Sequence, residues 1–244
     1  MVTEWPVGLA AGPKHSPALP RAHARLARRW EGGGSARCRG ISDCQILSLD
    51  HSFWQRSTIG GLSGDETTLS TVEAFDPQTG EWAAVAPMPT ARHGPGAAVL
   101  DGKIYVVGGF DENDTSLATV EVYDPATNAW SPAPPMGTDR TYLGVAALGG
   151  KLYAVGGYND DDNALSSAEV FDPQTQTWAP IAPMSTERRC GVVVAVQGKL
   201  YAAGGDDQHG ADLSSVEAYD PQQNRWEHVA PMSCARYGAA GVAI

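Results

Sequence analysis

Cysteines and long apolar runs are both scarce in this chain of 244 residues. The four cysteines, Cys38, Cys44, Cys190 and Cys234, form no Cys-x-x-Cys pair and share no spacing. A disulfide framework and a zinc site are therefore disfavoured, and reduced thiols in a cytoplasmic protein are the prediction. No stretch approaches the roughly 20 apolar residues that a transmembrane helix requires, so no membrane partner is expected.

Basic residues are fewer than acidic ones, 17 against 28, which gives a formal net charge of −11. The charge is divided unevenly. Residues 1–50 hold seven basic and four acidic residues, a balance of +3, which leaves −14 for the remainder. Binding to a nucleic-acid backbone needs a basic stripe, so an acidic chain of this kind predicts that nucleic acid is not a partner.

Residues in a catalytic or metal-binding arrangement are also missing. The six histidines share no spacing, and none stands near a Ser or Cys in a recognised nucleophile motif. The acidic runs 111–114, 160–162 and 206–207 lack the alternating oxygen ligands, central Gly and distal Glu of an EF-hand loop. We predict no catalytic residue, no cofactor and no metal site, and a solvated acidic rim that favours partners with a basic segment.

A repeat of 48 residues dominates what is present. Gly-Gly pairs recur at that step, as do a Glu, an Asp-Pro pair, a Trp, a Pro-Met pair and an Arg. The members are Gly60, Gly108, Gly156 and Gly204; Glu73, Glu121, Glu169 and Glu217; Asp76, Asp124, Asp172 and Asp220; Trp82, Trp130, Trp178 and Trp226; Met88, Met136, Met184 and Met232; and Arg92, Arg140, Arg188 and Arg236. A fixed step near 50 residues is typical of a unit that must stack on its neighbours to bury a face.

Each repeat reads as four short strands. Residues 96–100 and 104–107 are apolar runs joined by Asp101-Gly102, the strongest short hairpin signal. Residues 119–123 alternate between apolar and polar, an Asp-Pro turn follows, and Trp130 begins the last strand. The missing Cβ of the Gly-Gly pair predicts close approach of a backbone segment or an aromatic ring.

These motifs resemble the kelch repeat, in which Gly-Gly follows an apolar strand and precedes a spaced Tyr or Phe and then a Trp. Tyr105, Tyr153 and Tyr201 also match, and the resemblance covers residues 59–244. It implies an all-β kelch β-propeller of about four blades, each a four-stranded antiparallel sheet. Kelch domains commonly have six blades, so an incomplete propeller or an open arc is a second expectation.

The predicted domains are a disordered extension at 1–55, outside the repeat, and the propeller at 56–244. The extension is rich in Pro, Gly, Ala and Arg and lacks a sustained period; a transit peptide or a gene-model artefact are the alternatives. The first repeat lacks a recognisable first strand, whereas residues 236–244 supply a spare one. In kelch propellers a strand from one terminus commonly completes the blade at the other.

Two sets of residues are predicted to bind a partner. The resemblance implies that Arg92, Arg140, Arg188 and Arg236 face the partner and hold its acidic side chains, which Arg can do bidentately. The alternative is that each Arg pairs with a once-per-blade Glu and joins blades. The second set is Phe110 and Tyr158, aromatic anchors in the variable loops after Gly-Gly.

The function expected from this resemblance is protein recognition. In kelch-like proteins the propeller recruits substrates to a cullin-3 ubiquitin ligase through upstream BTB and BACK domains, and residues 1–58 are too short to contain either. Two alternatives stay open: an enzyme with a site in the central channel, of the sugar mutarotase or oxidase type, and a cytoskeletal scaffold.

Overall fold

The structure is a computed structural model, and it describes residues 44–47, 56–161, 163–239 and 241. All of them belong to one compact unit, Arg37–Ile244. This part of the chain holds sixteen strands and no helix, and so no helix in it is long or apolar enough to cross a membrane. The predicted all-β class is confirmed.

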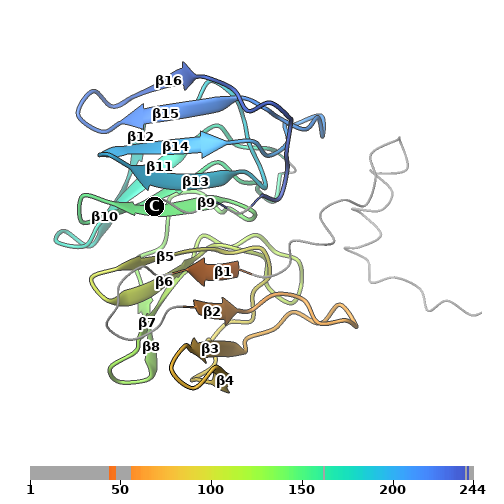
Figure 1. The fold of residues 1–244 in the computed structure, drawn as a ribbon, viewed down its shortest axis with the longest axis vertical. Coiled ribbons are helices and arrows are strands. Elements are labelled where there is room, and N and C mark those ends of the chain that lie inside the picture. Colours follow the sequence, from red (N-terminus) through yellow and green to blue (C-terminus); the bar gives the residue numbers. More distant parts are fainter. Residues whose placement is uncertain (1–43, 48–55, 162, 240, 242–244) are drawn as a thin grey trace, which may run out of the picture. The chain divides into compact units, whose positions relative to one another are not determined.

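The strands form four antiparallel sheets of four strands, each in chain order (Figure 1). The first sheet contains β1 (Cys44–Leu47), β2 (Arg56–Ile59), β3 (Val72–Asp76) and β4 (Glu81–Ala84); the second contains β5 (Gly96–Leu100), β6 (Lys103–Val107), β7 (Val120–Asp124) and β8 (Ala129–Ala133). The third contains β9 (Gly144–Leu148), β10 (Lys151–Val155), β11 (Ala168–Asp172) and β12 (Thr177–Ile181); the fourth contains β13 (Val192–Val196), β14 (Lys199–Ala203), β15 (Val216–Asp220) and β16 (Arg225–Val229).

Turn chemistry explains why the strands pair in this register. Asp101 and Gly102 both have positive φ, 51° and 73°, which is the backbone of a tight hairpin turn. The predicted hairpin between 96–100 and 103–107 is confirmed. After β7, the Asp124 carboxylate accepts a hydrogen bond from the backbone N–H of Ala126 at 2.9 Å, which closes the Asp-Pro turn.

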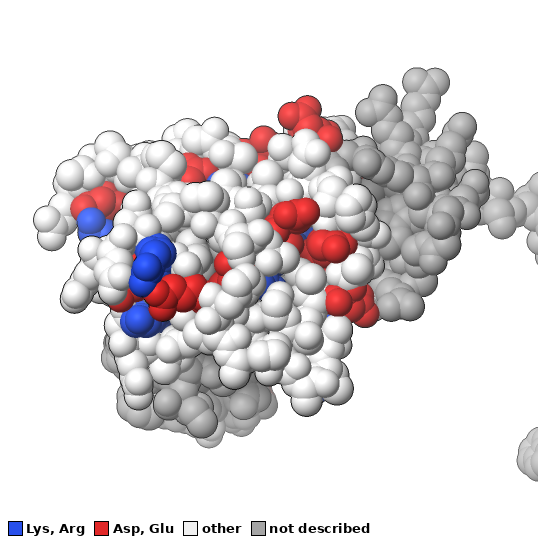
Figure 2. Space-filling view, turned by 90° about the horizontal axis from the view of Figure 1, so that it is seen from above, with Lys and Arg blue, Asp and Glu red and all other residues white. Residues whose placement is uncertain are grey.

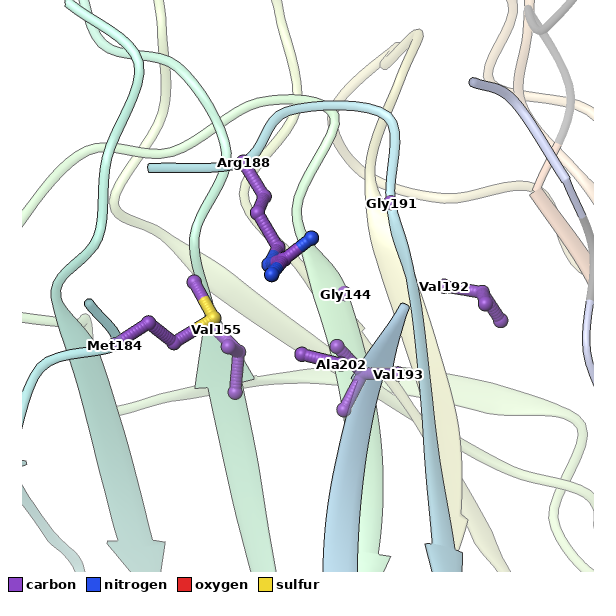
Figure 3. A pocket seen from close by; sticks show the side chains of 8 residues that line it. All are labelled: Gly144, Val155, Met184, Arg188, Gly191, Val192, Val193 and Ala202. Atoms are coloured by element: carbon purple, nitrogen blue, oxygen red, sulfur yellow. The ribbon is translucent and has the colours of Figure 1, made fainter. Parts of the chain in front are cut away.

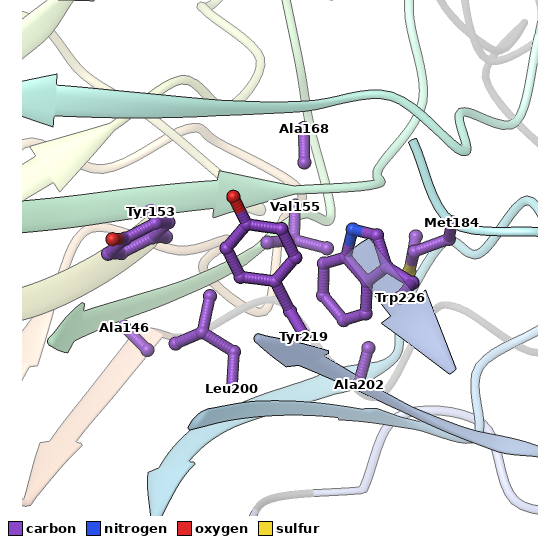
Figure 4. Packing of buried hydrophobic residues seen from close by; sticks show 9 residues of the cluster. All are labelled: Ala146, Tyr153, Val155, Ala168, Met184, Leu200, Ala202, Tyr219 and Trp226. Carbon is purple, nitrogen blue, oxygen red and sulfur yellow. The ribbon is translucent and has the colours of Figure 1, made fainter. Parts of the chain in front are cut away.

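Successive sheets pack through their first strands, β1 on β5, β5 on β9 and β9 on β13. Apolar clusters fill each junction. The side chains of Ile59 and Met88 meet Val106 between the first two sheets, and Val120 and Met136 belong to the cluster between the second and third. Figure 4 shows the third junction, where Tyr153, Val155 and Met184 meet Leu200, Tyr219 and Trp226. The sheets do not close: within the described residues, no packing of similar extent joins β13 to β1.

The first strand of the first sheet comes from upstream of the predicted propeller boundary. β1 pairs antiparallel with β2, with Cys44 opposite Ile59. It begins four residues earlier than a 48-residue step back from Gly96 would place it, so the repeat pattern does not identify it. The C-terminal segment lies elsewhere: a Cβ on Gly241 would meet Val192 of β13 at 2.6 Å. Gly241, the last described residue, therefore lies beside the fourth sheet, and the described residues after Arg236 form no strand.

Candidate functional site

The loop between successive sheets carries the arginine of the repeat, and three of these arginines are buried. Arg92 and Arg140 have no exposed surface and Arg188 is 3% exposed. Each guanidinium crosses the junction and pairs with the glutamate of the following sheet. The distances from Nη2 to Oε1 are 3.3 Å for Arg92–Glu121, 3.0 Å for Arg140–Glu169 and 3.0 Å for Arg188–Glu217.

The remaining guanidinium hydrogens are also used inside the junctions. Arg140 Nη1 donates to the carbonyl oxygens of Gly156 and Ser167, both at 2.9 Å, and Nη2 donates to the Ser167 hydroxyl. Arg92 and Arg188 repeat these bonds in their own junctions. Arg140 Nε also donates to Glu169, at 3.3 Å, whereas within the described residues Nε of Arg92 and Arg188 has no acceptor. The Arg140 junction is thus the most completely hydrogen-bonded.

The prediction that Arg92, Arg140 and Arg188 hold a partner's acidic side chains is wrong for this structure. Their donors are buried and are directed at protein atoms, so they cannot reach a second molecule. The alternative, that each Arg pairs with a once-per-blade Glu, is what the structure contains. Arg236 differs because its side chain is exposed and, among the described residues, has no ion pair.

Second donors hold each buried glutamate. The Thr90 hydroxyl donates to Glu121 at 2.6 Å, the Gly137 N–H to Glu169 at 2.7 Å, and the Ser185 hydroxyl and N–H to Glu217. Burial raises the pKa of Glu217, but the bonds from Ser185 and Arg188 outweigh burial and lower it overall. These donors differ in residue type, Thr90, Gly137 and Ser185, and therefore give no repeat signal, although they stand two or three residues before each arginine.

Burial also shifts the pKa of two of the repeat arginines. It lowers the pKa of Arg92 and Arg140, and the paired Glu121 and Glu169 partly offset this effect. An Arg stays protonated under such a shift because its ordinary pKa is so high. Each junction therefore contains a buried ion pair, and removal of one partner would leave an uncompensated buried charge.

The Gly-Gly pairs bring the arginine loop against the sheet. Gly108 has φ +65°, and a Cβ there would lie 2.1 Å from the carbonyl oxygen of Arg140. The next N–H, of Gly109, donates to that same oxygen at 2.9 Å. The close neighbour is therefore backbone, as the missing Cβ predicted, and the aromatic ring named as the alternative is not in this place.

The repeated tryptophans tie each sheet to the one before it. Indole Nε1–H groups donate to backbone carbonyl oxygens of the preceding sheet's last segment: Trp130 to Ala86 at 2.7 Å, Trp178 to Pro134 at 2.9 Å and Trp226 to Ala182 at 2.8 Å. The constant 44-residue separation of these partners was a signal that the sequence analysis did not use.

Phe110 and Tyr158, predicted as exposed aromatic anchors, are buried at 6% and 8% exposure. Phe110 packs on the rings of His93 and Tyr142, at 5.2 and 6.1 Å between ring centres. The Arg189 guanidinium lies over Tyr158, 5.3 Å from the ring centre. The backbone of each of these residues also forms a β-bridge with the residue after the repeat arginine, Phe110 with His93 and Tyr158 with Thr141. The prediction that they form the contact surface is corrected.

Polar pairs that occur in single copies lie beside these rings. His93 Nε2 is 3.7 Å from the Asp114 carboxylate and its Nδ1 is 3.2 Å from the Thr68 hydroxyl. Arg189 Nε donates to Asp206 at 2.8 Å. Burial raises the pKa of Asp206 and the charge of Arg189 only partly opposes it. The base of each loop after Gly-Gly therefore contains different polar side chains.

The loops after Gly-Gly carry eleven acidic residues and no Lys or Arg in 62–70, 110–117, 158–165 and 206–213. In Figure 1 the loops that follow β2 and β14 lie at the right, and Figure 2 shows acidic groups gathered toward that side with little blue among them. At the opposite hairpin ends, lysines pair with the Asp-Pro aspartates, Lys103–Asp124, Lys151–Asp172 and Lys199–Asp220. The surface of these four loops thus carries acidic side chains and, within the loops, no Lys or Arg. We call it the acidic loop face.

Some of these carboxylates stabilise the backbone of their own loops. The Asp111 carboxylate accepts hydrogen bonds from the N–H groups of Asn113 and Thr115, at 2.8 and 2.9 Å. Within the described ranges, no group of three or more His, Cys, Asp or Glu is placed to hold a metal ion. A small cavity lies around the Arg188 guanidinium, bounded by Gly144, Val155 and Val193, and its lining is otherwise apolar (Figure 3).

Comparison with known proteins agrees with this geometry. A family model described as the KLHDC2/KLHL20/DRC7 Kelch-repeats domain matches residues 55–244. Kelch-like ECH-associated protein 1A of Danio rerio is 37% identical over 73 residues, which is 29% of this chain and 11% of that protein. The chain thus matches only a small part of that relative's length.

A solved structure of YjhT has a similar fold. The TM-score is 0.70 at 16% sequence identity, and the match covers 82% of this chain and 73% of that one. At this identity the likeness shows the fold alone.

Proposed function

The chain belongs to the kelch-repeat family, and from this premise we propose that it is a protein-recognition module whose acidic loop face binds a basic segment of a partner protein. The observation that carries the proposal is the concentration of acidic side chains, without Lys or Arg, on the four loops after Gly-Gly. Charge complementarity of this kind steers association and selects partners. We propose that the protein acts in the cytoplasm by binding a partner and not by catalysing a reaction.

Contacts between neighbouring loops support a single continuous face. The Ser116 N–H donates to the Asp160 carboxylate at 2.7 Å, and the Asp160 N–H donates to Asp139 at 3.0 Å. The Ala164 N–H donates to the side chain of Gln208 in the next loop. Because the second, third and fourth loops hold one another, a partner would meet a preorganised surface, which lowers the entropy cost of binding.

Glu112 and Asp161 suit a test of this face because their side chains are exposed and accept no hydrogen bond among the described residues. We expect a displayed random-peptide library to yield Lys- and Arg-rich peptides with the natural protein, at low salt above all. The double variant Glu112→Lys, Asp161→Lys should bind the selected peptides at least about tenfold more weakly, since like charges then face each other.

The matched control is Glu81→Lys with Glu227→Lys, which makes the same change of charge at exposed strand positions outside the loops. It should bind as the natural protein does. Selection of peptides without basic residues, or equal weakening by both double variants, would overturn the proposal.

A finer form of the proposal is substrate recognition for a cullin-3 ubiquitin ligase, the role implied by the resemblance to kelch-like adaptors. Fusion of this chain to a BTB–BACK module should direct ubiquitination of a protein tagged with a selected basic peptide. Ubiquitination that does not depend on the tag would reject this finer role and leave peptide binding intact.

A further inference from the structure

The two ends of the array expose the two halves of a contact that is buried three times inside it. We call the side of a sheet that faces the preceding sheet its near side, and the side that faces the following sheet its far side. Every internal junction joins the far side of one sheet to the near side of the next. The first sheet has no described sheet on its near side, and the fourth has none on its far side. The residues on these sides keep the repeat pattern, so each end presents one half of a junction.

The near side of the first sheet carries Glu73 and Trp82, both exposed. Their equivalents, Glu121 and Trp130, are buried and half-buried, and make the ion pair and the indole hydrogen bond of the first junction. Trp82 is 48% exposed. We call this surface the start face.

The far side of the fourth sheet carries the other half: Tyr201, Val216 and Met232 are partly exposed and Val229 and Arg236 are exposed. We call it the end face. One repeat earlier, in the third sheet, the equivalents Tyr153, Ala168, Met184 and Arg188 are all buried, and Ile181 packs against them (Figure 4).

Trp82 and Val229 are the two large hydrophobic side chains exposed among the described residues, and one lies on each face. Repeat arrays that end without a partner normally have polar terminal surfaces, because an uncapped apolar face is poorly soluble. Within residues 44–47, 56–161, 163–239 and 241, these two faces carry exposed apolar side chains and no described segment covers them. They therefore call for an occupant.

The chemistry of the two faces is complementary. Arg188 pairs with Glu217 of the following sheet, and the glutamate at the same repeat position on the start face is Glu73. Ser233 stands where Ser185 donates to Glu217. The carbonyl of Ala230 stands where that of Ala182 accepts from Trp226, so it suits the Trp82 indole.

We propose that the occupant of each face is a second copy of this chain: the end face of one copy docks on the start face of another, with Arg236 paired to Glu73. Such head-to-tail contacts give rings when the rotation closes and open series when it does not. Two copies would present eight sheets, within the range of known propellers. The acidic loop face lies outside both surfaces, so this proposal is independent of the proposed function.

The test is the oligomeric state of the full chain, measured by sedimentation velocity over a concentration series. We expect a concentration-dependent mass above that of one chain. Glu73→Arg alone and Arg236→Glu alone should each weaken self-association by more than about a hundredfold, because each places like charges at every docking contact. Glu112→Arg, on the acidic loop face, is the control and should associate as the natural chain does.

Mixing the two single variants gives the decisive result. When a Glu73→Arg copy meets an Arg236→Glu copy, both possible contacts unite opposite charges, Arg with Glu in either order. The equimolar mixture should regain the mass that each variant lost. Closure of one chain upon itself cannot be rescued in this way, since each single variant would still oppose like charges within its own ring.

Trp82→Ala provides a second variant. It should weaken association more strongly than it lowers the melting temperature of the monomer, because Trp82 is 48% exposed in one chain and packs there on the ring of Phe75, 5.4 Å between ring centres. A natural chain that stays monomeric at every concentration, or a mixture that stays monomeric like its components, would overturn the proposal.

Discussion

The junction between the second and third sheets and the two outer faces of the array contain the same residue types at the same repeat positions, yet their environments are opposite. Arg140 and Glu169 are buried together, whereas Arg236 and Glu73 are exposed and apart. The role of a repeated residue is therefore set by whether a neighbouring sheet covers it. Inside the array the pair joins neighbouring sheets, whereas in the first and fourth sheets the corresponding Glu73 and Arg236 are exposed.

Replacing Arg140 and Arg236 in turn should give the largest difference in the free energy of unfolding between the buried and the exposed position. Arg140→Ala leaves the Glu169 carboxylate buried without its charge partner, which costs about 3–5 kcal/mol. Arg236→Ala should change the free energy of unfolding by less than about 0.5 kcal/mol under conditions where the chain is monomeric. Urea denaturation of both variants measures the difference. Equal losses would mean that burial does not distinguish the two positions.

The close backbone approach at the junction gives the next effect. Gly108→Ala places a Cβ on the Arg140 carbonyl and should destabilise the fold by about 3 kcal/mol or more. Gly150→Ala has a similar positive φ, +74°, but no atom within 4 Å of the new Cβ, so only about 1–2 kcal/mol of backbone strain is expected. A comparable loss for both in thermal denaturation would show that the contact with Arg140 is unimportant.

Removal of an indole hydrogen bond should have a smaller effect on the free energy of unfolding. Trp178→Phe removes the donor to the Pro134 carbonyl and should cost about 1 kcal/mol together with some packing. Trp82→Phe is the matched change at the start face, where no such acceptor is present among the described residues, and it should be neutral within about 0.5 kcal/mol. Chemical denaturation of both variants at low protein concentration makes the comparison.

The smallest effect is on pH dependence. A carboxyl group whose pKa is lower in the folded state stabilises the fold above its unfolded pKa, and that stabilisation is lost as the pH falls through the folded pKa. The pKa of Glu217 is lowered, so Glu217→Gln should make stability fall less steeply below about pH 4.5. Melting temperatures from pH 6 to pH 3 test this expectation.

Most of the fold could be predicted because it depends on local chemistry that is repeated. The Asp101-Gly102 turn, the alternating pattern of residues 119–123 and the Asp-Pro turns each define a strand or its end through backbone preferences. β1 was missed because residues 44–47 share no motif with Gly96–Leu100. Its antiparallel pairing with β2 is seen only in the structure.

The candidate site was predicted less well. The loops and their acidic character were found from the sequence, because charge and variability are properties of the residues themselves. The exposure of Phe110, Tyr158 and three of the arginines was misjudged, because a position in a variable loop does not reveal whether the side chain points outward or beneath it.

The sequence by itself determined the 48-residue unit, its four strands and turns, the net acidity and the pairing potential of Arg with Glu. Only the tertiary structure decided which arginine pairs with which glutamate. It also decided that, among the described residues, Arg236 pairs with no glutamate and Glu73 with no arginine. The physical reason is that strands and turns follow from interactions a few residues apart, whereas burial depends on surfaces that come from a neighbouring sheet 16 or more residues away along the chain.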